Sequence, residues 1–213
     1  MKLYFPIIII ILIGYIFGCF QSSYIISKYF KKVDIRNLGN GNAGASNTVI
    51  SLGWKWGVVV AILDIAKAIV SIFIIKVLIK NSFSNNSLPF YLYLNGLSVI
   101  LGHNYPFYMS FKGGKGTASL IGMLIAIDYR IAIIGILSII LITIITDYIA
   151  LGTIGLVILV IISTALFGYG TNAMLIAILI GLLSVYNHLP NINRILKKEE
   201  IGLRKTLKKD RAL

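Results

Sequence analysis

The sequence has few of the residues that soluble domains use to face water or to cross-link a small fold. Only 13% of its 213 residues are charged, seven residues are acidic, and Cys19 is the single cysteine. One cysteine excludes an internal disulfide and a cysteine metal cluster. So few charges do not supply the polar surface that a soluble domain of this size needs.

The apolar residues make up 58% of the chain and are gathered in blocks. A helix needs roughly 20 apolar residues to span a bilayer, and shorter runs are tolerated where protein shields their ends. The blocks cover residues 4–29, 54–79, 91–101, 117–127, 131–147, 149–168 and 173–187. The two short blocks, 91–101 and 117–127, predict short or partly inserted helices that hold the loop between them at membrane depth.

These blocks predict an all-α polytopic membrane protein with about seven transmembrane helices. One membrane domain accounts for residues 1–213, and residues 188–213 form a basic cytoplasmic tail. The polar stretch NSFSNNSLP, residues 81–89, is expected to be an external loop. Coiled-coil heptads, long linkers and convincing internal repeats are not found in the sequence.

The net charge of +13 is concentrated in three basic sets, which share one side of the membrane if there are seven segments. The sets are Lys28, Lys31, Lys32 and Arg36, then Lys112 and Lys115, then Lys197, Lys198, Arg204, Lys205, Lys208, Lys209 and Arg211. The opposite connections carry only Lys80 and Arg130. The positive-inside rule places the basic side and the C-terminus in the cytoplasm and the N-terminus outside. This distribution indicates topology and attraction to anionic lipid, not nucleic-acid binding.

Three polar stretches fall on the expected cytoplasmic side, and the first is DIRNLGNGNAGASNTVISLGW, residues 34–54. Glycines allow successive backbone N–H groups to turn toward one anion, and hydroxyl and amide side chains add donors or cap a following helix. An anion site and a solvated, turn-rich loop both remain open. The residues concerned are Gly39, Asn40, Gly41, Asn42, Gly44, Ser46, Asn47 and Thr48.

The second stretch is LGHNYPFYMSFKGGKGTASL, residues 101–120. It is not a nucleotide P-loop, because Lys115 is followed by glycine and position 109 is methionine. Lysine charges on a glycine-rich backbone suit a phosphate group. The residues concerned are Lys112, Gly113, Gly114, Lys115 and Gly116. For His103, a structural hydrogen bond and a functional role remain open.

The third stretch is YNHLPNINRILKKEE, residues 186–200. His188, Asn191 and Arg194 would share a helical face at spacings of three, although Pro190 disfavours helix at the residue before it. A capped, solvated tail helix is the alternative interpretation.

Two charges lie within an apolar block. Asp64 and Lys67 are three residues apart, and either a structural ion pair or a functional role explains them. Asp147 and Thr153 lie near the next cytoplasmic turn. The sequence offers no metal-ligand spacing and no convincing Ser-His-Asp triad. The chemistry that these stretches indicate is the handling of phosphorylated molecules at a membrane surface.

The motifs resemble those of the bacterial integral-membrane glycerol-3-phosphate acyltransferases that use acyl phosphate as donor. GHNYPFYMSFKGGKGTA matches the central motif of that family, and DIRNLGNGNAGASN matches its first. HLPNINRIL followed by Glu200 matches the third, and LDIAKA fits the second helix. Three ordered motifs over nearly the whole chain are a far more specific signal than one short match.

The resemblance implies transfer of an acyl group from acyl phosphate to the 1-hydroxyl of glycerol 3-phosphate. The products are 1-acylglycerol 3-phosphate (lysophosphatidate) and phosphate, in the first step of phospholipid biosynthesis. Acyl phosphate is a mixed anhydride, so the enzyme must position two anions and stabilise developing charge without a covalent nucleophile. The resemblance implies an active site on the cytoplasmic side of the cell membrane, with no metal or other cofactor. The oligomeric state stays open.

By similarity, the donor phosphate is held by the first motif and one threonine: Asn42, Gly44, Ser46, Asn47 and Thr153. Further substrate-binding residues are Asn40, Lys112, Gly113, Gly114 and Gly116. Glycerol 3-phosphate is assigned to Lys115, Asn191 and Arg194. His188 orients the acceptor or removes its proton, for which a substrate phosphate oxygen is the alternative base. Glu200 is expected to fix the third motif through a basic partner, and the acyl tail to lie between helices.

Two positions depart from the family pattern. The usual G-S-G-N of the first motif has Asn40 in place of serine, and Ile50 replaces an arginine. A charge-assisted hydrogen bond is worth roughly 1.5–3 kcal/mol, so losing the arginine is expected to weaken acceptor binding. Arg36, Lys55 and Lys112 are the candidates to replace its charge. Two alternatives therefore remain: a member with altered acceptor or lost activity, and a phosphate or organic-anion transporter.

Overall fold

The structure, a computed structural model, describes the backbone of residues 4–79 and 87–210 and the side chains of residues 7–79 and 87–207. Most of the expected external loop at 81–89 lies outside these ranges, as do Lys80, Arg211 and the side chains of Lys208 and Lys209. Within the described ranges every regular element is helical, which confirms the all-α prediction.

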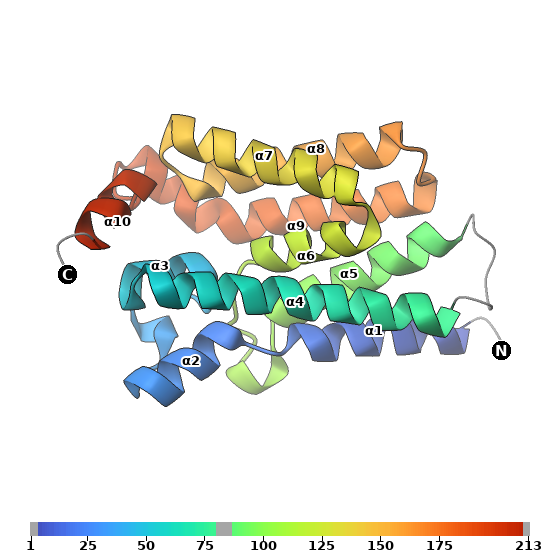
Figure 1. Ribbon diagram of the computed structural model, residues 1–213, viewed down its shortest axis with the longest axis horizontal. Coiled ribbons are helices and arrows are strands. Elements are labelled where there is room, and N and C mark those ends of the chain that lie inside the picture. The colour runs from blue at the N-terminus through green and yellow to red at the C-terminus, as the bar shows by residue number, and fades with distance from the viewer. Residues whose placement is uncertain (1–3, 80–86, 211–213) are drawn as a thin grey trace.

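The long helices run roughly parallel to the long axis of the molecule (Figure 1). One group holds α7, α8 and α9, the other holds α1, α4 and α5, and the short α6 lies between them (Figure 1). The elements are α1 (Tyr4–Gly18), α2 (Ser22–Lys31), η1 (Ile35–Asn37), α3 (Ala45–Leu52), α4 (Trp54–Ile79), α5 (Leu88–Asn104), η2 (Phe107–Met109), α6 (Thr117–Ile127), α7 (Tyr129–Thr146), α8 (Ile149–Leu166), α9 (Thr171–Leu196) and α10 (Leu203–Asp210).

Five of the helical segments are long and apolar enough to cross a membrane, namely Ile7–Lys31, Trp54–Ile79, Tyr129–Thr146, Ile149–Leu166 and Thr171–Leu196. The two blocks expected to be short correspond to α5, with 17 residues, and α6, with 11. Each apolar block therefore forms helix. A count of about seven spans and the orientation of the chain stay predictions.

The composition of the first apolar block predicted one helix. The structure instead has two helices there, separated by a break after Gly18. Irregular backbone is tolerated at membrane depth only where protein satisfies its polar groups. Here the Lys67 ammonium donates to the carbonyls of Gly18 at 3.2 Å and Phe20 at 2.7 Å. The hydroxyl of Tyr108 donates to the Cys19 carbonyl at 2.7 Å. Distant side chains thus complete the hydrogen bonds of the break.

The Lys67 side chain also joins α4 to α5. It lies 2.9 Å from the carboxylate of Asp64, which accepts a hydrogen bond from the Ser22 hydroxyl at 2.8 Å. It lies 2.8 Å from Nδ1 of His103. The intramembrane pair therefore helps to close the α1–α2 break, and His103 has a structural hydrogen bond.

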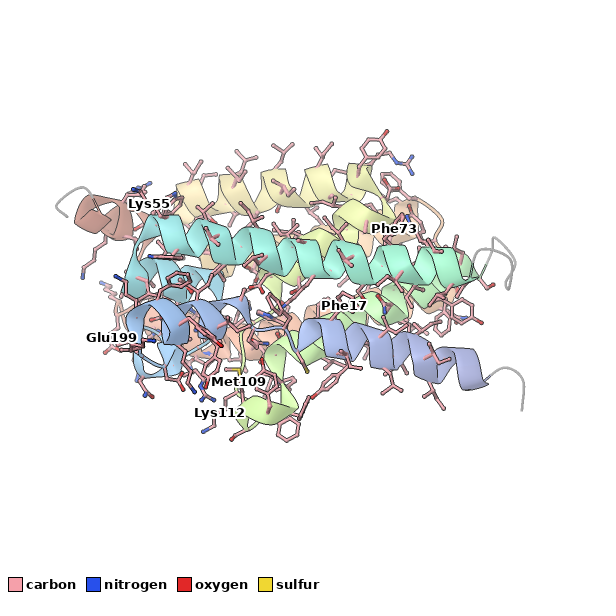
Figure 2. The ribbon with its side chains drawn as sticks, turned by 60° about the horizontal axis from the view of Figure 1, so that its bottom comes forward. Phe17, Lys55, Phe73, Met109, Lys112 and Glu199 are labelled. Atoms are coloured by element: carbon pink, nitrogen blue, oxygen red, sulfur yellow. The ribbon has the colours of Figure 1, made fainter. Side chains whose placement is uncertain are left out.

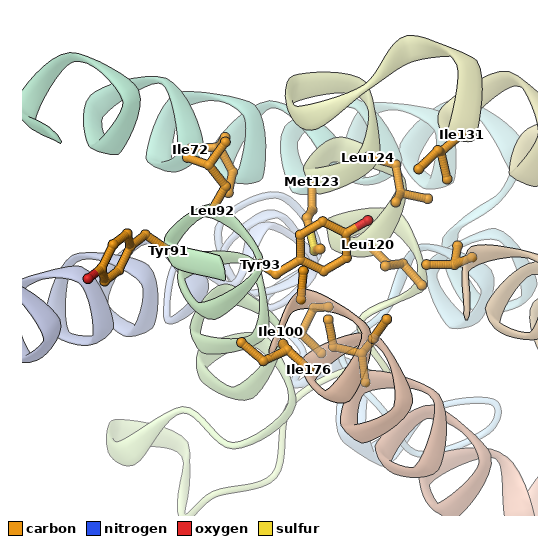
Figure 3. Packing of buried hydrophobic residues seen from close by; sticks show 14 of the residues in the cluster. Ile72, Tyr91, Leu92, Tyr93, Ile100, Leu120, Met123, Leu124, Ile131 and Ile176 are labelled. Atoms are coloured by element: carbon orange, nitrogen blue, oxygen red, sulfur yellow. The ribbon is translucent and has the colours of Figure 1, made fainter. Parts of the chain in front are cut away.

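Buried side chains from α4, α5, α6 and α9 fill the centre of the bundle (Figure 3). Tyr93, Leu120 and Met123 are at most 2% exposed. Where α1 crosses α5, however, backbone approaches backbone directly. A Cβ on Gly102 would lie 2.2 Å from the Tyr15 carbonyl oxygen, and one on Gly18 would lie 2.1 Å from that of Val99. Close packing of this kind drives helix association in lipid, where burial of apolar surface contributes little.

Gly102→Ala is expected to destabilise the protein, because the added methyl group meets rigid backbone. The expected cost is roughly 1–3 kcal/mol, as for overpacking in general. Gly181→Ala is the matched control, since a Cβ there would be 3.0 Å from the flexible end of Ile161. Thermal unfolding in detergent measures both, and equal destabilisation of the two variants would contradict the close α1–α5 contact.

Candidate active site

Three helix N-termini meet at one cavity of about 370 Å³. The walls include Ser46 at the start of α3, Thr117 at the start of α6 and Ala150 at the start of α8. The first turn of a helix leaves backbone N–H groups without helical partners and carries partial positive charge. The convergence of three such ends makes the polar part of the cavity suitable for anions.

Most of the predicted site residues line this cavity: Asn40, Asn42, Gly44, Ser46, Asn47, Lys115, Gly116, His188, Asn191 and Glu200. Five do not line it: Lys112, Gly113, Gly114, Thr153 and Arg194. The structure thus brings residues of all three motifs to one cavity. The residues that do not line it lie behind or beside its wall.

Asn47 shapes the loop of the first motif instead of presenting its amide to an anion. Its Nδ2 donates to the carbonyls of Ile35, Leu38 and Asn42 at 3.1, 3.0 and 2.8 Å. Its Oδ1 accepts from the backbone N–H of Asn40 at 2.6 Å. The side chain is therefore fully used within the protein, unlike the phosphate-binding role expected from the sequence. Ser46, in contrast, is exposed at the start of α3.

Gly113 and Gly114 also have a role different from the expected one. Their N–H groups donate to the carbonyls of Asn104 and His103, both at 3.0 Å, so neither N–H is left for an anion. A Cβ on Gly114 would lie 2.1 Å from Nε2 of His103. These glycines let the chain pass close over His103 and place the next residue, Lys115, at the cavity.

Lys112 and Thr153 lie outside the cavity. Lys112 is exposed, and Figure 2 shows it beside Met109 on the outer side of its loop. The Thr153 hydroxyl donates to the Ile149 carbonyl at 3.1 Å and lies 3.3 Å from the hydroxyl of Thr117, which does line the cavity. Thr153 therefore contacts the wall from behind and does not reach the cavity itself.

The third motif belongs to α9, which continues through Pro190 as far as Leu196. The expected tail, residues 188–213, therefore begins within this helix. As predicted, the spacing of three places His188, Asn191 and Arg194 near one face of the helix. His188 and Asn191 are 4% and 8% exposed and line the cavity.

A chain of hydrogen bonds runs from the central motif through the third. The Lys115 ammonium donates to Oδ1 of Asn191, and Nδ2 of Asn191 donates to Oε1 of Glu200 at 2.6 Å. The other carboxylate oxygen of Glu200 accepts from Nε of Arg194 at 2.6 Å. Glu200 thus has the basic partner that the sequence predicted. Arg194 supports the site through this carboxylate and does not line the cavity.

Lys115 is the single lysine or arginine among the described cavity-lining residues. Burial is the main cause that lowers its pKa to about 8; the charge of Arg194 acts in the same direction and that of Glu200 opposes it. Burial of a cation without a full counter-charge favours its neutral form. An anionic ligand beside Lys115 would supply the missing charge.

The candidates to replace the missing arginine do not line the cavity. Ile50 is part of the wall, whereas Arg36, Lys55 and Lys112 are not. Arg36 instead pairs with Asp34 at 2.7 Å and donates to the Met109 carbonyl at 2.9 Å. In this structure none of the three brings its charge to the cavity wall, and compensation for Ile50 stays a prediction.

His188 is oriented by its own helix. Its Nδ1 lies 2.8 Å from the carbonyl oxygen of Ser184, which can only accept a hydrogen bond. In the neutral ring the proton is therefore on Nδ1, and Nε2 carries the lone pair. The side chain thus presents a proton acceptor.

Two titratable lining residues were not among the predicted site residues. Asp64 and His103 form part of the wall. The sequence carried a signal for each, since intramembrane charges mark functional regions by default and His103 is the second residue of the central motif. Sequence alone did not show that they lie together, because they come from different helices.

Part of the cavity wall is apolar, and we call this part the apolar arm. Its residues come from α4, α6 and α7, and include Val58, Ile65, Ile121 and Ile139. A cavity with a polar end and an apolar arm fits an amphipathic ligand.

Comparison with known proteins identifies a consistent set of relatives. The profile of the family described as Glycerol-3-phosphate acyltransferase matches residues 8–198. Glycerol-3-phosphate acyltransferase 1 of Oceanobacillus iheyensis is 49% identical over 193 residues, covering 90% of this chain and 92% of that protein. Glycerol-3-phosphate acyltransferase of Aquifex aeolicus is 36% identical, with coverages of 90% and 96%.

Two solved structures have the same fold. The crystal structure of PlsY (YgiH), an integral membrane glycerol 3-phosphate acyltransferase, in its glycerol 3-phosphate form has a TM-score of 0.83 and 34% identity. It covers 92% of this chain and 95% of its own. The lysophosphatidic acid form has a TM-score of 0.80 and 32% identity, with coverages of 94% and 98%. The transporter alternative finds no support among these relatives.

The Nδ1–H tautomer of His188 is a testable expectation. The chain has two histidines, so ¹⁵N-histidine NMR in detergent resolves them, with His103→Gln for assignment. At neutral pH, Nδ1 of His188 is expected to show the shift of a protonated nitrogen, and Nε2 that of an unprotonated one. A proton on Nε2 would exclude that nitrogen as a base.

Proposed function

Because the chain belongs to the glycerol-3-phosphate acyltransferase family, we propose that it transfers an acyl group from acyl phosphate to the 1-hydroxyl of glycerol 3-phosphate. The products are lysophosphatidate and phosphate, and the site faces the cytoplasm. One observation carries this proposal: a lysine, a proton-accepting histidine and three helix N-termini share one cavity whose walls also include the apolar arm.

The two phosphate groups have separate places in this proposal. The donor phosphate lies at the N-terminus of α3, where Ser46 and Asn42 face the cavity. The acceptor phosphate lies at Lys115 and Asn191 beside the N-terminus of α6. A full charge at Lys115 and oriented backbone dipoles at the helix ends favour both anions. The acyl chain occupies the apolar arm.

The reaction needs correct placement more than a covalent intermediate. The acceptor hydroxyl oxygen attacks the acyl carbonyl carbon, and the bond from that carbon to the phosphate oxygen breaks. Nε2 of His188 takes the hydroxyl proton and returns it to the departing phosphate. Positioned general-base groups contribute about 10²- to 10⁴-fold to rates, and orientation of the reactants contributes the rest.

Proteoliposomes supplied with acyl phosphate and labelled glycerol 3-phosphate test the activity. Lys115→Ala is expected to raise the KM for glycerol 3-phosphate, because the cation that faces its phosphate is removed. His188→Ala is expected to lower kcat by about 10²-fold or more, because the base is lost. Lys112→Ala is the control, since that exposed side chain lies outside the cavity. No product from folded wild-type protein at high acceptor concentration would refute the proposed function.

The lowered pKa of Lys115 gives a pH dependence of known sign. Below its pKa of about 8, Lys115 is charged and binds a phosphate; above it the amine is neutral and the contact weakens. The kcat/KM for glycerol 3-phosphate is therefore expected to fall as pH rises through about 8, since this ratio reports ionisations of the free enzyme. Lys115→Arg is expected to remove this decline, because arginine stays charged throughout the pH range in which the amine of Lys115 is neutralised. The same decline in both proteins would assign it to another group.

A further inference from the structure

A short segment near the C-terminus, residues 200–206, forms one wall of the cavity; we call it the strap. Glu200, Ile201, Leu203 and Thr206 of the strap line the cavity. At its start, the N–H of Glu200 donates to the Arg194 carbonyl at 3.2 Å. From Leu203 onward the strap is the first turn of α10. The strap therefore carries Glu200, which orients Asn191 opposite Lys115.

Asp147, in the turn between α7 and α8, holds the strap where α10 begins. Its backbone carbonyl accepts from the N–H of Leu203 at 2.8 Å, and its Oδ1 accepts from the N–H of Arg204 at 2.8 Å. The guanidinium of Arg204 also donates to the Ile144 carbonyl at 3.0 Å. A carboxylate at the start of α10 satisfies a backbone N–H that has no helical partner.

The contact between Asp147 and the strap is close. A Cβ on Gly202 would lie 1.9 Å from Oδ2 of Asp147, so no larger residue fits there unless one of the two moves. Asp147 has a φ of +74°, a left-handed conformation that is unusual for a non-glycine residue. Glycine adopts that conformation more readily, so the turn itself does not require aspartate. The carboxylate therefore has a use beyond forming the turn.

We propose that Asp147 is a positioning residue of the active site: by fixing the strap, it fixes Glu200 and, through it, the Asn191 amide that faces Lys115. This inference rests on the proposed acyl transfer. Asp147 itself does not line the cavity. Its effect falls on the acceptor side, because the affected hydrogen bonds lead to Lys115 and not to the first motif. A shift of about 1 Å in such a support costs on the order of 10²-fold in rate.

Asp147→Gly distinguishes positioning of the active site from a general contribution to the stability of the fold. Glycine suits the positive φ and keeps the backbone carbonyl that binds Leu203, so the melting temperature is expected to stay within a few degrees, about the effect of small turn substitutions. The KM for glycerol 3-phosphate is expected to rise about tenfold, since one oriented contact is weakened, while that for acyl phosphate changes little. Asp147→Asn keeps an oxygen for the Arg204 N–H and is expected to restore most activity.

Lys32→Gly is the matched control. Lys32 also has a positive φ, +55°, at the end of α2, and it is exposed and outside the cavity. The same substitution there is expected to leave both KM values unchanged. An active wild type with an equally active Asp147→Gly would overturn the inference while leaving the proposed function intact. A loss of activity that is fully explained by a lower melting temperature would overturn the inference as well. An inactive wild type would refute the proposed function instead.

Gly202→Ala tests the contact from the other side. The added methyl group is expected to displace the strap and raise the same KM. In the double variant with Asp147→Gly, the atom that the methyl group would meet is gone, so the two effects are expected to be less than additive. Full additivity would show that the two residues act independently, and it would contradict the proposal that Asp147 fixes the strap.

Discussion

The most consequential interaction in the bundle is the buried ammonium of Lys67. It satisfies two carbonyls where α1 breaks, pairs with Asp64 on its own helix and reaches Nδ1 of His103 on α5. A broken helix at membrane depth is stable only when protein supplies such partners. His103 in turn supports the glycines that precede Lys115. The placement of the cavity lysine thus depends on a charge that does not itself line the cavity.

The polar end of the cavity combines three helix ends with one lysine instead of several cations. Burying full charges in a membrane protein carries a large desolvation cost unless each is paired. Helix N-termini bring partial positive charge and N–H donors together with the fold itself. Lys115, the single lysine or arginine among the described cavity-lining residues, then adds one full charge with an amide partner. Such a site suits anions.

Sequence reasoning identified the right motifs but assigned several residues the wrong physical role. Glycines beside lysines suggested free N–H donors, yet the N–H groups of Gly113 and Gly114 are used by carbonyls of α5. Asn47 was expected at a phosphate and instead holds its own loop together. Residue type and spacing tell which atoms are available for hydrogen bonding. They do not tell which partner each atom takes once distant segments approach.

The sequence by itself determined that the protein is a membrane protein, that it is all-helical and which three stretches form the site. These follow from local properties: apolar block length, charge distribution, glycine flexibility and motif order. The tertiary structure alone decided where α1 breaks, which side chains line the cavity and how Asp147 holds the strap. The contacts responsible join residues that are far apart, such as Lys115 with Asn191, separated by 76 positions, and Asp147 with Arg204, separated by 57. Hydrogen-bond satisfaction in a dry interior is a property of the assembled bundle, so no single stretch of sequence contains it.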